Sequence, residues 1–247
     1  MSKHIGILTA GGDCQGLNAA LRAVTLAALK EGWKVTGIHD GFLGLAEGCI
    51  MPLDKSSVSS IIGLGGTILG TGRGGGRAKG TEEAVDNCIR SFEALGLDAL
   101  VCLGGDGTQR FSYELAKKGI PIITLPKTID NDIAQTDITF GYDTAVQVSV
   151  MALDRLRTTA ESHHRLMILE VMGRDAGWLA AGAALAGGAD ICLIPEIPYS
   201  TTAIVKSLKA QIYEHKAALL VVAEGAISQE DALLGLKPKK HAAAIKL

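Results

Sequence analysis

The amino-acid sequence predicts an α/β fold built from mainly parallel sheets with helices on both faces. Short apolar runs alternate with stretches of helical period along almost the whole chain of 247 residues. Glycine is frequent, at 31 residues, and many of the glycines stand where an apolar run turns into a helix. This alternation is typical of parallel sheets, whose ligands bind beyond the carboxyl ends of the strands.

The expected elements follow one another in order. Strands are expected at residues 4–10, 33–40, 97–105, 120–126, 165–173, 189–196 and 217–225. Helices are expected at residues 17–32, 81–96, 110–119, 175–188 and 201–216, with a longer one beginning at about Tyr142. Gly32 is the expected C-cap of the first helix, and Thr81 is the expected N-cap of the second. The stretch from Gly63 to Gly80 is expected to be irregular, and the pattern frays after Ile227.

Two Rossmann-like lobes are expected, with a boundary near Phe140. Residues 1–139 would form the first lobe and residues 140–247 the second. The long helix that begins at about Tyr142 can carry the chain from one lobe to the other.

Composition and charge exclude several classes of partner. The formal net charge is −2 and the basic residues are scattered, so neither nucleic acid nor an anionic membrane surface is an expected partner. No apolar run approaches the roughly 20 residues that span a bilayer. The N-terminal residues start a strand at once and leave no room for a signal peptide, so a cytoplasmic protein is expected. The five cysteines form no CxxC pair and are expected to be free, mostly buried thiols.

Two Gly-rich turns follow expected strands and have features of phosphate-binding sites. The first is LTAGGD at residues 8–13, and the second is CLGGDGT at residues 102–108. Backbone N–H groups at a helix N-terminus bind phosphate, and glycine is needed where the backbone approaches the anion. Asp106 would repel a phosphate chain unless a bridging Mg²⁺ lay between them. The alternatives are an ordinary Gly–Gly turn and an Asp–Gly turn in which Asp106 caps a helix.

A third segment, PKTIDND at residues 126–132, places two carboxylates and a hydroxyl at the end of an expected strand. A general base must reach the acceptor hydroxyl and take its proton as the new P–O bond forms. A second carboxylate can help to hold a metal ion. A simple Asx-rich turn is the alternative.

Together these segments resemble the phosphofructokinase family. The motifs stand in the order seen in that family: GGD, GGTILGTGR from Gly65, GGDGT, PKTIDNDI, SHHR from Ser162 and EVMGR from Glu170. GGDGT alone is also similar to a motif of NAD kinases and diacylglycerol kinases, whereas TIDND and MGR together are specific to phosphofructokinases. The resemblance covers essentially the whole chain. It implies an ATP-dependent 6-phosphofructokinase of glycolysis, which transfers the γ-phosphoryl group of Mg-ATP to the 1-hydroxyl of fructose 6-phosphate.

The resemblance also implies residue roles. Asp130 matches the base that activates the sugar hydroxyl, Thr128 and Arg174 match positions at the reacting groups, and Asp106 matches the residue that carries Mg²⁺. The positions that match the nucleotide-phosphate site are Gly12, Arg73, Gly74, Gly105, Asp106, Gly107 and Thr108. The positions that match the sugar-phosphate site are Thr128, Asp130, Arg165, Met172, Gly173, Arg174 and Glu224. Arg165 matches an arginine that reaches a neighbouring subunit's site, which implies a homo-oligomer, a dimer or a tetramer. Residues 1–139 would then bind the nucleotide, and residues 140–247 the sugar phosphate.

Two positions bear on the phosphoryl donor. Family members that use ATP carry glycine after GGD, as Gly107 does here, whereas many that use pyrophosphate carry an aspartate that would repel the α-phosphate. Lys127 favours pyrophosphate, since the pyrophosphate enzymes carry lysine at this position where many ATP enzymes carry glycine. The combination resembles an ATP-using subgroup related to the pyrophosphate branch, so ATP is expected and a pyrophosphate-dependent phosphotransferase is the alternative.

The family pattern includes a further strand, a HxQRGG segment and more helices, which this sequence lacks. These supply cations for the sugar 6-phosphate, so weak sugar-phosphate binding and an incomplete second lobe are expected. A fragment or a non-catalytic regulatory or scaffold subunit is therefore the alternative of another class. The intact Asp106, Thr128, Asp130 and Arg174 argue against a non-catalytic subunit, whereas the absent segment argues for one.

Overall fold

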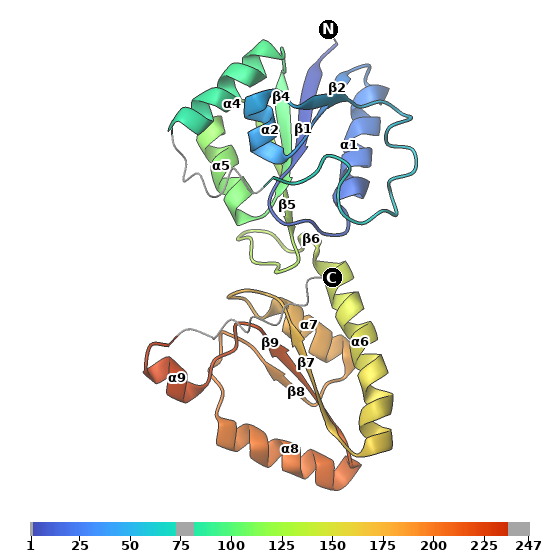
Figure 1. Ribbon diagram of the computed structural model, residues 1–247, viewed down its shortest axis with the longest axis vertical. Coiled ribbons are helices and arrows are strands. Elements are labelled where there is room, and N and C mark those ends of the chain that lie inside the picture. The colour runs from blue at the N-terminus through green and yellow to red at the C-terminus, as the bar shows by residue number, and fades with distance from the viewer. Residues whose placement is uncertain (1, 73–81, 237–247) are drawn as a thin grey trace. The chain divides into compact units, whose positions relative to one another are not determined.

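A computed structural model describes residues 2–72 and 82–236, which form two compact units (Figure 1). The first unit comprises Met1–Thr128 and Ile133–Gly141, and the second comprises Ile129–Asp132 and Tyr142–Leu247. Because residues 129–132 belong with the second unit, the PKTIDND segment is divided between the two. The assignment of nucleotide and sugar-phosphate binding to residues 1–139 and 140–247 stays a prediction.

The first unit contains a six-stranded sheet in the order β3-β2-β1-β4-β5-β6. Its strands are β1 (His4–Thr9), β2 (Lys34–Ile38), β3 (Ile50–Pro52), β4 (Ala99–Gly104), β5 (Ile122–Thr128) and β6 (Phe140–Gly141). The pairing of β3 with β2 is antiparallel, and the other pairs are parallel. The central strands β1 and β4 are buried along almost their whole length, which is why each is a continuous apolar run in the sequence.

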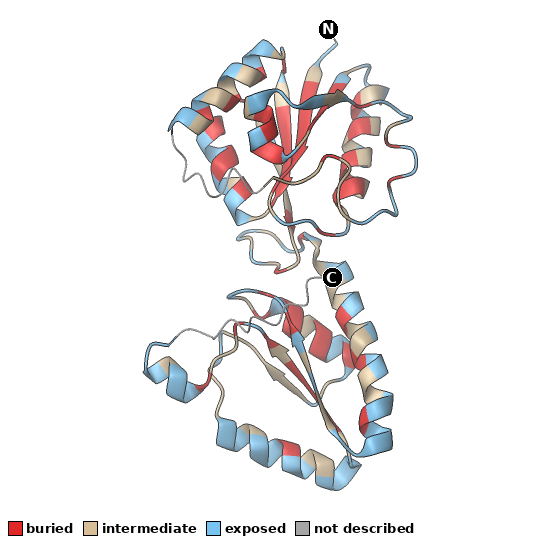
Figure 2. Ribbon diagram, viewed as in Figure 1, coloured by how far each residue is buried: buried red, intermediate tan, exposed pale blue. Residues whose placement is uncertain are grey.

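Helices lie on both faces of this sheet. They are α1 (Leu17–Lys30), α2 (Gly41–Glu47), α4 (Glu82–Ala94) and α5 (Asp106–Lys117). Helix α1 covers one face, while α2, α4 and α5 cover the other, and the buried residues line the faces turned toward the sheet (Figures 1 and 2). Phe42 of α2 and Phe111 of α5 belong to the core of the second face, with ring centroids 4.5 Å apart.

The structure departs from the sequence-based elements in several places. The short edge strands β3 and β6 were not expected, and α5 begins at Asp106, four residues before the expected start at residue 110. Helix α2 was not expected, because two glycines in seven residues weaken its helical propensity; it forms because Phe42 and Leu45 are buried in the core. Strand β5 does not end at Pro126 but continues to Thr128, because Lys127 and Thr128 pair with β6. Gly32 lies just past α1 with a φ of +72°, as its expected capping role requires, whereas Thr81 lies outside the described residues.

The second unit contains a three-stranded parallel sheet in the order β7-β9-β8. Its strands are β7 (Leu166–Val171), β8 (Ile191–Leu193) and β9 (Ala218–Ala223), and its helices are α6 (Tyr142–His163), α7 (Trp178–Gly187), α8 (Thr201–His215) and α9 (Gln229–Leu233). Helices α6 and α7 pack on β7 and β9, with Leu153 and Val221 fully buried between them. Helix α8 buries only Leu208 and is otherwise mostly exposed (Figure 2).

The predicted α/β fold, with mainly parallel sheets and helices on both faces, is confirmed. The expected state of the cysteines is also confirmed, since all five thiols are free and three of them are buried. Burial raises the pKa of Cys88 and of Cys102 to about 12, so both thiols are protonated members of the core. Within residues 2–72 and 82–236, no helix is both long enough and apolar enough to cross a bilayer.

Candidate functional site

The first Gly-rich turn leaves β1 at the centre of the six-stranded sheet. The Ala10 amide donates to the Leu103 carbonyl at 2.9 Å, so the turn begins in register with β4. Gly11 then takes a φ of +83°, which favours glycine. The Thr71 hydroxyl donates to the Gly11 carbonyl, and the buried Lys127 ammonium donates to the Gly12 carbonyl. Two carbonyl dipoles that would repel an anion are therefore held by donors of the protein.

The second Gly-rich turn leads from β4 into α5. A side chain at Gly104 would overlap Thr108, so glycine is required for the buried Thr108 to pack against the strand end. Gly105 is the N-cap of α5 and provides no side-chain cap for the first amides of the helix. A side chain at Gly107 would meet no atom of residues 2–72 and 82–236 within 4 Å, so these residues leave the position in front of this helix end uncovered.

The strand order places these two turns side by side. From β1 the sheet proceeds to β2 on one side, and from β4 it proceeds to β5 on the other. The order therefore reverses between β1 and β4, and open α/β sheets bind ligands at such a point. The N-terminus of α5 adds the positive end of a helix dipole. This arrangement can hold a phosphate chain and brings together the predicted positions Gly12, Gly105, Asp106, Gly107 and Thr108, whereas Arg73 and Gly74 lie outside the described residues.

Two buried side chains that the sequence analysis did not single out shape this region. The Asn18 side-chain amide donates to the Leu64 carbonyl at 3.1 Å, and its oxygen accepts from the Ile68 amide at 2.9 Å. The Thr9 hydroxyl donates to the Gly70 carbonyl at 2.7 Å. They fasten the irregular segment that precedes Gly72 beside the first turn, where Gly72 pairs with Ala10.

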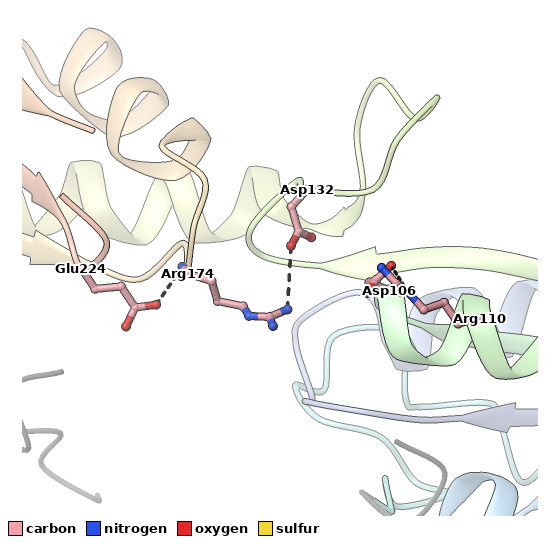
Figure 3. A network of polar contacts seen from close by, with 5 residues as sticks. All are labelled: Asp106, Arg110, Asp132, Arg174 and Glu224. Carbon is pink, nitrogen blue, oxygen red and sulfur yellow. Dashed lines mark hydrogen bonds and ion pairs between the residues drawn. The ribbon is translucent and has the colours of Figure 1, made fainter. Parts of the chain in front are cut away.

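Asp106 stands at the start of α5 with half of its side chain exposed. Arg110, one turn along the helix, lies 3.0 Å from the Asp106 carboxylate through its Nε (Figure 3). No group of three or more His, Cys, Asp or Glu side chains arranged for a metal ion occurs in the described part of the chain. Magnesium is typically held by one or two carboxylates together with substrate phosphates, so Asp106, beside a turn whose geometry can hold phosphate, fits it.

In the second unit, two segments leave neighbouring strands at their carboxyl ends. Met172, Gly173 and Arg174 follow β7, and Glu224 follows β9. Their closeness follows from the register, since the Glu224 amide donates to the Val171 carbonyl at 2.9 Å. The structure therefore brings these predicted sugar-phosphate positions together.

The backbone around Arg174 is tightly constrained. Gly173 has a φ of +146°, and a side chain there would come within 2.5 Å of the Ala176 carbonyl oxygen. Arg174 itself has a φ of +54°, and its amide donates to the Glu224 carboxylate at 2.8 Å (Figure 3). A side chain at Gly225 would overlap the Arg174 carbonyl oxygen. These contacts fix where the arginine side chain starts.

The Arg174 guanidinium lies 3.8 Å from the Asp132 carboxylate, and 64% of the arginine side chain is exposed (Figure 3). Asp130, two residues earlier in the same segment, is buried at 7% exposure. The second unit thus combines an exposed cation, able to bind an anionic group, with a buried carboxylate in the segment next to it.

Arg165 stands apart from this group. It directly precedes β7, whereas Arg174 follows that strand, so roughly 20 Å of extended chain separates them. Its role in a neighbouring subunit's site stays a prediction.

Comparison with known proteins places these features in a family. The phosphofructokinase family model matches residues 4–246. The chain is 49% identical over 232 residues to an ATP-dependent 6-phosphofructokinase of Chloroflexus aggregans, covering 91% of this chain and 65% of the relative. It is 44% identical over 227 residues to a pyrophosphate–fructose 6-phosphate 1-phosphotransferase of Amycolatopsis methanolica, covering 92% of this chain and 66% of the relative.

Solved structures show the same likeness. Phosphofructokinase from Saccharomyces cerevisiae superposes with a TM-score of 0.81 at 30% identity, covering 93% of this chain and 34% of that one. The chain spans about two thirds of the length of the curated relatives named above. From the match across residues 4–246 and the agreement in fold, the chain belongs to the phosphofructokinase family.

Proposed function

We propose that the chain acts as an ATP-dependent 6-phosphofructokinase, a phosphotransferase that converts fructose 6-phosphate to fructose 1,6-bisphosphate. The observation that carries this proposal is the pair of Gly-rich turns at the reversal of strand order, with space in front of Gly107 that no described residue fills. A polyphosphate chain as long as that of ATP needs such space. The 49% identity to an ATP-dependent relative supports the same donor.

In this proposal the first unit binds the donor. The amides at the start of α5 hold phosphate oxygens, and the Lys127 and Thr71 contacts keep the carbonyls of the first turn away from them. Asp106 would hold Mg²⁺, which when bound neutralises charge on the phosphates. Thr128, at the end of β5, helps to hold the group that is transferred.

The second unit binds the acceptor. Arg174, with Met172 and Gly173, holds the sugar phosphate, and Glu224 accepts a hydrogen bond from a sugar hydroxyl. A carboxylate offers several acceptor sites, so Glu224 can do this while it holds the Arg174 amide. The 1-hydroxyl oxygen of the sugar attacks the γ-phosphorus, the bond to the β-phosphate oxygen breaks and ADP leaves. Asp130 takes the hydroxyl proton.

A pyrophosphate-dependent phosphotransferase is the second candidate. The observation in its favour is Lys127, a buried cation at the first turn, where it would lie near a short anionic donor. The Amycolatopsis relative, with 44% identity, is named for that activity. A homo-oligomer in which Arg165 completes a neighbour's site and a cytoplasmic location belong to the proposal for either donor.

One assay separates these possibilities. The purified chain is incubated with fructose 6-phosphate and Mg²⁺, with ATP or pyrophosphate as the only donor, and fructose 1,6-bisphosphate is measured. Product with ATP alone is expected. If product forms only with pyrophosphate, the donor in the proposal is pyrophosphate and not ATP. If no product forms with either donor, a non-catalytic subunit or fragment is favoured.

Arg110 is expected to lower the apparent affinity for Mg²⁺, because its guanidinium occupies the Asp106 carboxylate at 3.0 Å. Exposed ion pairs are weak, so Arg110→Ala should reduce the half-saturating Mg²⁺ concentration by only about twofold to fivefold. The measurement is the rate as a function of free Mg²⁺. Lys117→Ala, which breaks the Lys117–Glu114 pair on the same helix, is the matched control. An Mg²⁺ dependence equal to that of the control would contradict the competition.

A further inference from the structure

The loop that carries Arg174 is fastened at two points by carboxylates from other segments. At the first point, the Arg174 amide donates to Oε1 of Glu224 at 2.8 Å. At the second, the Gly177 amide donates to Oε1 of Glu196 at 2.8 Å. Only Asp175 and Ala176 lie between the two anchored residues. Neither the sequence motifs nor the proposed mechanism gives Glu196 a role.

The contact at Gly177 is closely fitted. Gly177 is buried and is the N-cap residue of α7. Because it is glycine, it has no side chain with which to cap that helix. A side chain at Gly177 would come within 2.6 Å of Oε2 of Glu196 and 2.5 Å of Cβ of Ile194. The Glu196 carboxylate therefore lies beside the position that a capping side chain would take. It satisfies a buried amide and places negative charge at the positive end of the α7 dipole.

The anchor at Gly177 bears directly on Arg174. A φ of +54° is unfavourable for arginine and persists only where the surroundings impose it. Between the anchors, the Ala176 amide donates to the Gly173 carbonyl at 3.0 Å and closes a tight turn. Releasing Gly177 would free the C-terminal end of this turn and leave Glu224 to hold it alone.

We propose that Glu196 is a positioning residue, which holds the Arg174 loop by capping α7 and so sets the affinity for the anionic group that Arg174 binds. The identity of that group as a sugar phosphate rests on the proposed function. The anchoring itself does not, because it is a property of the second unit alone. In this proposal Glu196 contacts neither the sugar hydroxyl nor the transferred phosphoryl group, and it acts only by holding the Arg174 loop.

The test compares Glu196→Ala and Glu196→Gln with the wild type and with Glu161→Ala, an exposed glutamate on α6 that serves as a control. Hydrogen exchange measured by mass spectrometry reports on the peptide that spans residues 172–180. Steady-state kinetics with fructose 6-phosphate report on KM and kcat separately. Glu196→Gln retains an oxygen that can accept from Gly177 and keeps the test informative if the alanine variant folds poorly.

In Glu196→Ala, exchange of the 172–180 peptide should become about tenfold faster, while peptides of β7 and β9 keep wild-type rates. The KM for fructose 6-phosphate should rise about fivefold with kcat nearly unchanged, because binding and not chemistry is affected. In Glu196→Gln, both the exchange rate of this peptide and the KM should return most of the way to the wild-type values.

Two results would overturn the proposal: unchanged exchange in the 172–180 peptide, or faster exchange throughout the second unit, which would make Glu196 a general stabilising residue. A wild-type chain without phosphotransferase activity would refute the proposed function. The exchange measurement would still decide whether Glu196 anchors the loop.

Discussion

Asp130→Asn is expected to lower kcat for phosphoryl transfer to fructose 6-phosphate by about a thousandfold, within the range measured for general bases. Asparagine has nearly the same shape as aspartate but cannot take the hydroxyl proton. Asp130 is 7% exposed, and its neighbour Asn131 has a φ of +52°, so the segment is held in one conformation that the substitution should preserve. The loss should therefore appear in kcat and not in folding.

Two measurements distinguish loss of a base from loss of structure. The dissociation constant for ATP should stay within about twofold of the wild-type value, because the donor turns lie in the first unit and Asp130 belongs to the second. Asp154→Asn, an exposed position on α6, should retain full activity and controls for the change of charge. A turnover in Asp130→Asn close to that of the wild type would remove Asp130 from the role of base.

The sequence predicted where the candidate site residues lie in the fold better than it predicted which residues they contact. Strands β1 and β4 are apolar because both of their faces are buried, so they and the glycines that follow them stand out in the sequence. Parallel strands bring such turns to one edge of a sheet, which made the Gly-rich turns predictable. Helix α2 was missed because Phe42 and Leu45 stabilise it through tertiary packing and not through local propensity.

Contacts between distant segments left little local signal. Asn18 holds the Ile68 amide across 50 residues, and Glu196 holds the Gly177 amide across 19. An asparagine in a helix or a glutamate after a strand is ordinary in a sequence, and its importance depends on which buried amide lies opposite it in the fold. The same reason explains why the pairing of Arg174 with Asp132 became visible only in the structure.

Gly107→Asp is expected to reduce kcat/KM for ATP by about a hundredfold. The new carboxylate would stand beside Asp106 at the start of α5, where a side chain enters open space and no described atom shields it. This carboxylate would repel the α-phosphate of ATP. Like charges about 4 Å apart repel by about 4 kcal/mol at an effective dielectric constant near 20, so a hundredfold loss requires only part of that repulsion. Pyrophosphate has no α-phosphate or nucleoside to meet this carboxylate, so any use of that donor should fall much less.

Gly107→Ala separates charge from bulk. It adds a methyl group in the same open space, and the glycine has no positive φ that alanine would strain. Its kcat/KM for ATP should stay within about threefold of the wild-type value, and alanine in the first turn should stabilise α5 by roughly 0.5–1 kcal/mol. Steady-state kinetics with each donor, and thermal unfolding of each variant, test both statements. If Gly107→Ala loses as much ATP use as Gly107→Asp, steric exclusion and not charge governs the donor at this position. If neither variant loses any, Gly107 does not face the donor, and Lys127 would become the main determinant of donor choice.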